Sequence, residues 1–535
     1  MRWKIFLLLG QFIVSSHFVL SADSPQPANH YFQKAVQNAR FANEAFRRCS
    51  NFVSGWLNHA DPRTGLIPRN LSKSKDIWNA RDAAADNYPF MVLTAAITNP
   101  VLFKGRMLDM LHTETRLTSR LNRLPDTYSF TKKGFEAEAI DTSQVIFGAS
   151  EYIKDGLMPL TEWLGASPWS QRMLGMMDDI WKFAAYPTPY GKIPASSHEV
   201  NGELMQVLSR LYWMTGKTEY LDYAFRIADY YLFEKHPARQ NERLRLRDHG
   251  CEIVSGLAEI YLTSAFADTQ KKQTYHQPIH ELFDCILAKG RNEHGMLFDW
   301  FNPVTGEHSE RLCDTWGYNY NGFYTLYLID STAPYKDAII RVLSNLDEHY
   351  QYLDWENNSA DGYADAIESG LNLYNREPVQ SVSHWIEFQT RIMWDKQQPD
   401  GVIEGWHGDG NFARTSIMVA LWKTRGLTVT PWNEGIFFGA EQQGDSLFVS
   451  LSTNESWSGR LKFDIPRHRD YLHLPMDYPR INQFPEWFTT DAKQRYRIHS
   501  NDFAQLGEVV GSELIDGLRL RLEPGKQYRI VISKQ

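Results

Sequence analysis

Residues 248–257, DHGCEIVSGL, decide the fold, because a polar cluster leads directly into a helix-like stretch of apolar and small residues. Segments of the same kind recur, and the whole set begins at Asn79, Asp141, His198, Asp248, Asp314, Asp361 and Asn411. The intervals between these starts average about 55 residues, which accommodates two helices and two loops. The repeating unit is therefore predicted to be a helical hairpin.

The first helix of each predicted hairpin has a different character. Residues 219–233, EYLDYAFRIADYYLF, place their aromatic and apolar side chains on one helical face and most charges elsewhere. Glycine-centred turns such as TGLIP at residues 64–68 and DGVIE at residues 400–404 separate helix-like stretches. Charged outer helices that alternate with small-residue inner helices indicate two concentric layers. We expect a mainly α fold, an (α/α) toroid of six or seven hairpins over residues 23–427.

The hydrophobic period changes from 3.6 to 2 after Gly426. Residues 446–452, SLFVSLS, and residues 517–533, GLRLRLEPGKQYRIVIS, alternate apolar and polar side chains. Residues 428–535 are therefore predicted to form an antiparallel β-sheet or β-sandwich domain. The Pro-rich and aromatic segment 476–488, MDYPRINQFPEWF, fits neither period. We interpret it as a long ordered loop that packs on the toroid.

Composition and the N-terminus limit the classes of function. The chain has 535 residues, with 56 basic and 64 acidic side chains and a formal net charge of −8, which gives no support for a nucleic-acid partner. Residues 1–22 carry Arg2 and Lys4 before an apolar run and are typical of a signal peptide. We expect a secreted or periplasmic protein with no membrane insertion after cleavage. The four cysteines form no CxxC pair, so they indicate no zinc site, and they permit but do not require disulfides.

Two motifs carry a resemblance. DPRTGLIP at residues 61–68 follows the first outer helix, and GNFARTSIMVALWKTRGL at residues 410–427 closes the predicted toroid. With the repeated hairpin, these stretches resemble the six-hairpin glycosidase and toroid polysaccharide-lyase superfamily, and the second is similar to the last hairpin of unsaturated-uronyl hydrolases. A helical domain followed by a β domain is also similar to several toroid lyases and some arabinofuranosidases. The resemblance implies a carbohydrate-active enzyme and carries over no catalytic residue.

A closed toroid brings the N-terminal ends of its inner helices to one rim, where their partial positive charge favours anions. Arg81, Arg247 and Arg414 lie near such ends and either bind a substrate carboxylate or pair with neighbouring aspartates. Trp316 and Trp406 are predicted to stack on sugar rings. The predicted substrate-binding residues are Arg81, Asp82, His198, Asn201, Arg247, Asp248, Trp316, Asn319, Trp406, Asp409 and Arg414.

The first hypothesis for the chemistry is β-elimination in an acidic, uronate-containing glycan, with catalytic residues among His249, Tyr318 and His407. In this scheme His249 is the base and Tyr318 the acid, while Arg247, Arg81 and Asn319 hold the substrate carboxylate. The alternative is a glycoside hydrolase that uses two carboxylates among Asp248, Asp314, Asp365, Asp409 and Glu404. A third hypothesis is a non-catalytic repeat protein that binds glycan or protein.

No cofactor is predicted to be required. On the helix that begins at Asp361, Asp365 and Glu368 continue an acidic stripe. This stripe is interpreted as a source of a hydrolytic acid or base, as a site for a structural calcium ion, or as a solvated helix face.

Overall fold

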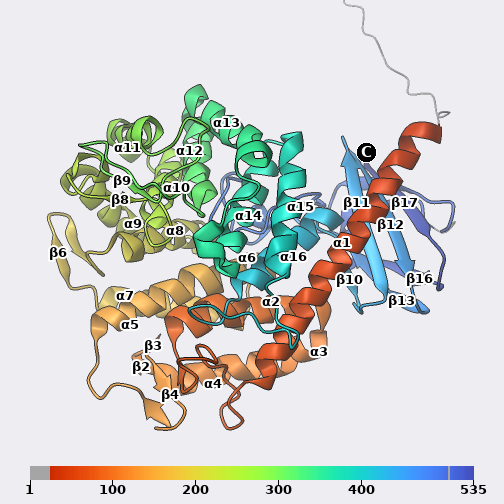
Figure 1. The fold of residues 1–535 in the computed structure, drawn as a ribbon, viewed down its shortest axis with the longest axis horizontal. Coiled ribbons are helices and arrows are strands. Elements are labelled where there is room, and N and C mark those ends of the chain that lie inside the picture. The colour runs from red at the N-terminus through yellow and green to blue at the C-terminus, as the bar shows by residue number, and fades with distance from the viewer. Residues whose placement is uncertain (1–24, 504–505) are drawn as a thin grey trace, which may run out of the picture.

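The computed structural model describes residues 25–503 and 506–535, and its helices form a ring beside a smaller β domain (Figure 1). The predicted signal peptide, residues 1–22, lies outside the described residues. None of the described helices combines the length and apolar character needed to cross a membrane.

The toroid is built from two layers of helices. The outer layer consists of α1 (Pro25–Asn58), α3–η2–α4 (Pro100–Leu102, Phe103–Met107, Leu108–Thr118), α7 (Pro168–Lys182), α9–η4 (Thr218–Asp229, Tyr230–Glu234), α11 (Thr269–Lys289), α13 (Ala333–His349) and α15 (Gln380–Trp394). The inner layer consists of η1–α2 (Ala80–Asn87, Tyr88–Thr98), α5–η3–α6 (Thr142–Glu151, Tyr152–Leu157, Met158–Leu164), α8 (His198–Thr215), α10 (Cys251–Ala267), α12 (Trp316–Asp330), α14 (Ala360–Tyr374) and α16 (Asn411–Thr424).

Each inner helix packs against the next one in the chain, and α16 packs back against α2, which closes the ring. The prediction of an (α/α) toroid is therefore confirmed, and within the described residues it contains seven hairpins.

Small residues allow the inner helices to approach closely. A Cβ atom on Gly202 of α8 would lie 2.3 Å from the backbone of Glu252 in α10, and one on Gly317 of α12 would lie 2.4 Å from Ser369 in α14. A larger side chain at either position would push two inner helices apart. The Ala, Gly and Ser content that distinguishes these segments in the sequence is thus a packing requirement of the ring.

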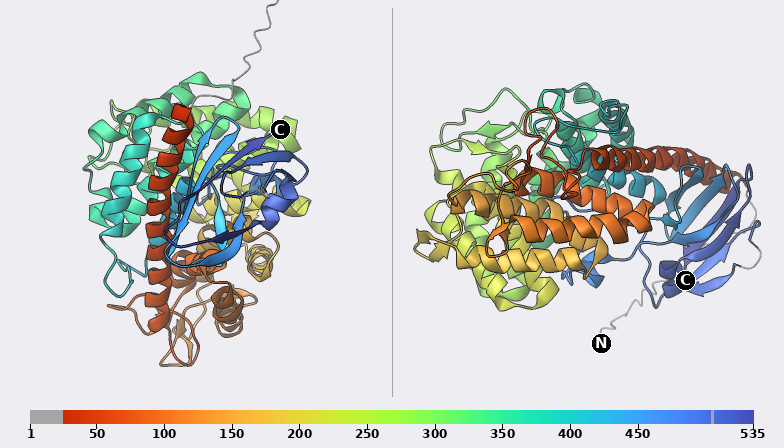
Figure 2. Two further views of the ribbon diagram at one scale, coloured as in Figure 1. Left: turned by 90° about the vertical axis from the view of Figure 1, so that its right-hand side faces the viewer. Right: turned by 90° about the horizontal axis from the view of Figure 1, so that it is seen from below.

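The C-terminal domain contains two antiparallel sheets. One has the strand order β10 (Thr428–Thr430), β13 (Trp457–Lys462), β16 (Leu518–Leu522), and the other has the order β11 (Ile436–Gln443), β12 (Ser446–Thr453), β17 (Tyr528–Lys534), β14 (Arg495–His499), β15 (Glu508–Val510). Helix α1 lies along β11 and β12 (Figure 2). The approach is tight at Gly439, where a Cβ atom would lie 2.2 Å from the nitrogen of Ala39. The predicted antiparallel β domain is present and is fixed to the toroid.

The segment 476–488 contains no helix or strand, and it contacts both the toroid and, through Phe488, strand β17 of the β domain. The Tyr478 hydroxyl donates to Glu259 of α10 at 2.8 Å, and Arg480 pairs with Glu162 of α6 at 2.7 Å. Both Tyr478 and Arg480 are buried. This segment, the plug loop, therefore links the β domain to the centre of the helical ring.

The four cysteines, Cys49, Cys251, Cys285 and Cys313, are free thiols. Only Cys285 is partly exposed, and the other three are buried. The large toroid core accounts for a fold that needs no disulfide.

Candidate active site

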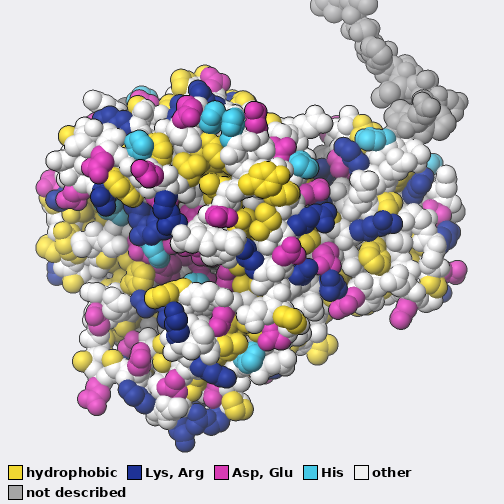
Figure 3. Space-filling model, in the orientation of Figure 1, with side chains coloured by type: hydrophobic (Ala, Val, Ile, Leu, Met, Phe, Trp, Pro, Cys, Tyr) yellow, Lys and Arg dark blue, Asp and Glu magenta, His cyan; other side chains and the backbone are white. Residues whose placement is uncertain are grey.

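The N-terminal ends of the inner helices surround a cavity of about 370 Å³. The space-filling view shows a hollow on this face whose interior is acidic, with basic side chains near its edge (Figure 3). Eight of the lining residues are carboxylic acids, namely Asp82, Asp86, Glu151, Asp155, Asp248, Glu252, Asp361 and Asp365. Four are Lys or Arg, namely Arg69, Arg81, Lys154 and Arg414. The cavity is therefore rich in carboxyl groups, and burial raises the pKa of several of them, including Asp86, Glu151 and Asp361.

Acidic residues in and beside the cavity recur four positions apart on five of the seven inner elements. The pairs are Asp82 and Asp86 on η1, Glu151 and Asp155 on α5–η3, Glu199 and Glu203 on α8, Asp248 and Glu252 at the start of α10, and Asp361 and Asp365 on α14. A separation of four residues places two side chains on one helix face, about one turn apart. This recurring pair is the signal by which sequence alone could have found Glu151, Asp155 and Glu203, which were not predicted.

On one wall, His407 faces two aspartates without direct hydrogen bonds. Its Nε2 atom lies 3.6 Å from Asp86 and 3.9 Å from Asp82, and its Nδ1 atom lies 3.0 Å from the carbonyl of Gly408. Asp82 is held by Arg69 at 2.5 Å. Burial and the charges of Asp82 and Asp155 raise the pKa of Asp86 to about 8, although His407 opposes the shift. Asp86 therefore carries a proton at neutral pH.

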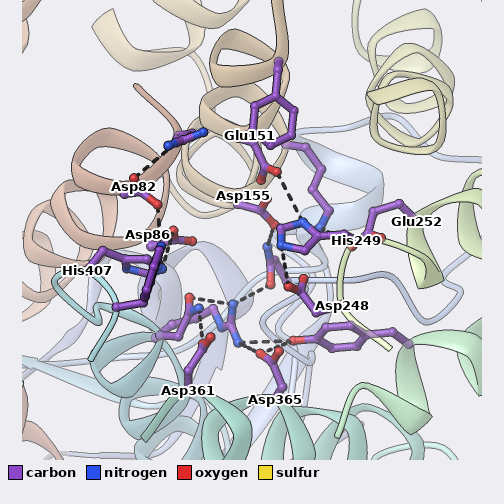
Figure 4. Close-up of a pocket in the computed structure, with 18 of the residues that line it drawn as sticks. Asp82, Asp86, Glu151, Asp155, Asp248, His249, Glu252, Asp361, Asp365 and His407 are labelled. Atoms are coloured by element: carbon purple, nitrogen blue, oxygen red, sulfur yellow. Dashed lines mark hydrogen bonds and ion pairs between the residues drawn. The ribbon is translucent and has the colours of Figure 1, made fainter. Parts of the chain in front are cut away.

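On the facing wall, His249 is in direct contact with Asp248 and Glu199, and Figure 4 shows it beside Asp248 and Glu151. Its Nε2 lies 3.0 Å from Asp248, and its Nδ1 contacts Glu199. Burial alone would lower the pKa of His249, but these carboxylates outweigh it and raise the pKa well above its usual value. Partial burial would raise the pKa of Asp248, but the positive charge of His249 and its contact with Asp248 outweigh this effect. The pKa of Asp248 is therefore below its usual range. The pair is therefore an imidazolium and an ionised carboxylate.

The deepest part of the site is a closed polar network around Arg414. This guanidinium pairs with Asp365 at 2.7 Å and Glu368 at 2.9 Å. The Tyr318 hydroxyl lies 2.8 Å from Asp365 and 3.1 Å from Glu368. Burial raises the pKa of Tyr318 well above its usual value. Arg414, Tyr318, Asp365 and Glu368 are thus engaged with one another, and Arg414 already neutralises the carboxylates suggested for calcium.

Carboxylates crowd together near η3. One oxygen atom from each of Glu151, Asp155 and Glu203 lies within 4.8 Å of the others. Burial and neighbouring carboxylates raise the pKa of Glu151 and Glu203 well above their usual values. Retained protons or a bound cation would each relieve this repulsion. Asp82, Asp86 and His407 form a similar group within 4.8 Å.

The structure brings many of the predicted site residues to the cavity. Those that line it are Arg81, Asp82, Asp248, His249, Tyr318, Asp365, Trp406, His407 and Arg414. Glu404 and Asp409 line an adjoining groove that shares Trp406 and His407 with the cavity. Trp406 is 70% exposed and suits a stacking platform at the mouth.

Other predicted residues do not reach this cavity. His198 lines a separate pocket beside Tyr231. The buried side chains of Asn201 and Asn319 donate to backbone carbonyls, which gives them structural roles. Trp316 is fully buried, so the prediction that it stacks on a sugar is wrong. Its apolar bulk fills the space between α12 and the outer helices.

Two further predicted residues lie near the cavity without lining it. Arg247 is not among the residues that line it. Burial raises the pKa of Asp314 to about 7, with Glu356 and Asp248 adding to the shift. Asp314 is buried at the start of α12.

No protein-family model and no curated protein matches this sequence. Among solved structures, the chain is similar to an inactive variant of a family 76 α-1,6-mannanase from a Salegentibacter species bound to an α-1,6-linked mannotetraose. The identity is 9% and the TM-score 0.40, over 70% of this chain and 97% of that one. A GH127 β-arabinofuranosidase gives 13% identity and a TM-score of 0.37, over 94% and 76%. A cellobiose 2-epimerase from Bacillus thermoamylovorans gives 12% and 0.38, over 49% and 84%.

Proposed function

We propose that the protein is a secreted glycoside hydrolase in which Asp86 is the general acid and Asp248 the general base. The observation that carries this assignment is the different contact of two carboxyl groups with histidine on facing walls of one cavity (Figure 4). The Asp86 side chain is only 16% exposed and lies no closer than 3.6 Å to His407, which favours its protonated form, whereas Asp248 lies 3.0 Å from His249, which favours its ionised form. Paired carboxyl groups whose pKa values are pushed apart supply an acid and a base.

The proposed reaction is hydrolysis with inversion. Asp86 donates its proton to the glycosidic oxygen as the bond to the anomeric carbon breaks. Asp248 accepts a proton from the water that attacks that carbon from the opposite side. The Asp248 side chain is 46% exposed, so water reaches it from the mouth of the cavity. After each turnover, proton exchange with solvent returns both carboxyl groups to their starting states.

The lining of the cavity supports a sugar that binds through its hydroxyl groups. Eight carboxyl groups line the cavity and can accept hydrogen bonds, whereas Arg414 is already paired with two acids and is not free to bind a uronate. The exposed ring of Trp406 offers an apolar face for one sugar of the chain. These features support a glycan that binds through hydroxyl groups donating to carboxylates.

The β-elimination hypothesis is less well supported by the same geometry. A base must be unprotonated, but His249 contacts two carboxylates that stabilise its protonated form. An acid must reach the leaving oxygen, but the Tyr318 hydroxyl is buried between Asp365 and Glu368. Nothing in the cavity specifically favours a non-catalytic binding role.

The test is an assay of the purified protein on panels of neutral, amino and uronate-containing oligosaccharides. Hydrolysis generates new reducing ends without ultraviolet absorbance, and in ¹⁸O-labelled water it places one heavy oxygen on the anomeric carbon. New absorbance from an unsaturated uronate would replace the hydrolase proposal with the lyase. Binding without cleavage of any panel member would indicate a non-catalytic protein.

A further inference from the structure

The plug loop reaches inner helices from several sides of the ring. Tyr478 bonds to Glu259 on α10, and Arg480 pairs with Glu162 on α6. Asn482 contacts residues on η3, α14 and α16, as described below. A single short segment that touches so many inner elements must lie near the axis of the ring. Figure 1 shows it as the blue loop inside the helices.

Asn482 is the residue of the plug loop that lines the cavity. Its side-chain amide donates to Asp155 at 2.7 Å, and its side-chain oxygen accepts from Arg414 at 2.9 Å. Its backbone N–H donates to Glu368 at 2.6 Å. Asn482 is 2% exposed and has a φ of 60°, a left-handed conformation that Asn adopts more readily than most residues. One side chain thus bridges a cavity carboxylate and the Arg414 network.

The plug loop closes the end of the cavity opposite the mouth. Arg480, Ile481, Asn482 and Gln483 are each at most 2% exposed. Ile481 packs in a small buried cluster with Cys251 and Tyr318, which belong to the helices around the cavity. Solvent therefore does not reach these side chains from the side of the plug loop that faces away from the cavity. The cavity ends at Asn482.

We propose that the β domain, through this loop, makes the cavity a blind pocket that accepts only chain ends, with Asn482 as the positioning residue at its floor. The inference rests on the proposed hydrolase function and specifies its mode of action as exo. A sugar that rests on Asn482 has no cavity beyond it, so the rest of the chain leaves through the mouth and the sugar at the floor is the terminal one. Asn482 orients Asp155, whose carboxylate then accepts hydrogen bonds from the terminal sugar.

The first experiment follows products from oligosaccharides labelled at one end. The wild-type protein is expected to release a product of one size from one chain end at the earliest time points, and blocking that end is expected to stop hydrolysis. Early release of many product sizes would show internal cleavage. That result would overturn the blind pocket and leave the proposed hydrolase function standing.

The second experiment tests Asn482 with Asn482→Ala and Asn482→Asp, using the exposed Asn454→Ala as the matched control. Asn482→Ala is expected to lower kcat at least 10-fold while the melting temperature identifies any loss of folding. In Asn482→Asp the new carboxyl donates to Asp155 only when protonated, so its activity relative to wild type is expected to rise as pH falls. Equal pH profiles for Asn482→Asp and wild type, or an unchanged kcat in Asn482→Ala, would overturn the positioning role.

The third experiment needs no activity. Under native conditions iodoacetamide is expected to modify Cys285 and to spare Cys251 and the distant, buried Cys49. Ile481→Ala is expected to speed modification of Cys251 at least 10-fold with Cys49 unchanged. Rapid modification of Cys251 in the wild type would overturn the closed floor. If no glycan is hydrolysed, the proposed function and the chain-end proposal are both wrong. In that case slow modification of Cys251 would still support the closed floor of the cavity.

Discussion

The two walls of the cavity contain the same residue types and reach opposite protonation states. Each has one histidine beside carboxyl groups: His407 lies beside the two groups of Asp82 and Asp86, and His249 beside the three groups of Asp248, Glu199 and Glu151. On the first wall the closest nitrogen–oxygen separation is 3.6 Å, and on the second it is a direct contact.

The difference shows how distance and exposure, and not residue type, fix the proton. A direct ion pair holds Asp248 ionised, and its side chain is 46% exposed, so water also solvates the charge. The looser contact at His407 compensates less, and the charges of Asp82 and Asp155 add to the burial of Asp86. Asp86 therefore keeps its proton. Variants of Asp86, Asp248 and His249 therefore alter one wall of the cavity at a time.

Asp86→Asn is expected to have the largest effect. The amide keeps the shape but cannot deliver a proton to the leaving oxygen, so kcat is expected to fall about 1,000-fold on an unactivated glycan. The loss should be much smaller on an aryl glycoside whose leaving group needs little protonation. Asp337→Asn on the exposed face of α13 is the control and should change neither rate. An equal loss on both substrates would argue that Asp86 is not the acid.

Asp248→Asn is expected to lower kcat about 100-fold, because water would no longer be deprotonated as it attacks. The decisive measurement is rescue. Azide needs no base, so on an activated substrate it is expected to restore part of the rate in Asp248→Asn and none in Asp86→Asn. If azide rescues neither variant, another carboxylate, such as Asp155, takes the role of the base.

The sequence predicted the helical ring and the wall that contains Asp248 and His249. It did not predict which carboxyl groups of the cavity hold a proton. Hairpin spacing and the change of period after Gly426 identified both domains, because they follow from local helix and strand geometry. The polar helix starts located Asp248, His249 and His407, since a closed ring forces those ends together. Trp316 was misassigned because sequence distance to a polar cluster does not reveal which way a side chain points.

Long-range contacts were beyond the reach of local patterns. Asn482 joins Asp155 across 327 positions, so no periodicity relates them. The acid pairs of the inner helices, in contrast, were available in the sequence as a spacing of four. The 3.6 Å gap at His407 depends on how the loop that carries His407 packs against η1, and it decides the chemistry proposed for Asp86.

The pH dependence sharpens the same comparison. Asp86 acts only when protonated, so activity is expected to fall as pH rises through about 8, the pKa that burial gives this group. Asp248 acts only when ionised, so activity is lost on the acid side. His249→Gln removes the imidazolium that lowers the pKa of Asp248, and the acid limb should move to higher pH by about one unit with the alkaline limb unchanged. Movement of both limbs would mean that the two walls titrate together.

Trp406→Ala is expected to have the smallest effect and to separate binding from chemistry. Stacking of an aromatic ring contributes about 0.5–1.5 kcal/mol, so KM is expected to rise about 2- to 12-fold while kcat changes little. Trp316→Phe is the matched control: it should lower the melting temperature, because it leaves a void in the core, and should leave KM unchanged. Trp406 lies beside His407, so a fall in kcat without a change in KM would instead indicate that its ring holds the Asp86 wall in place.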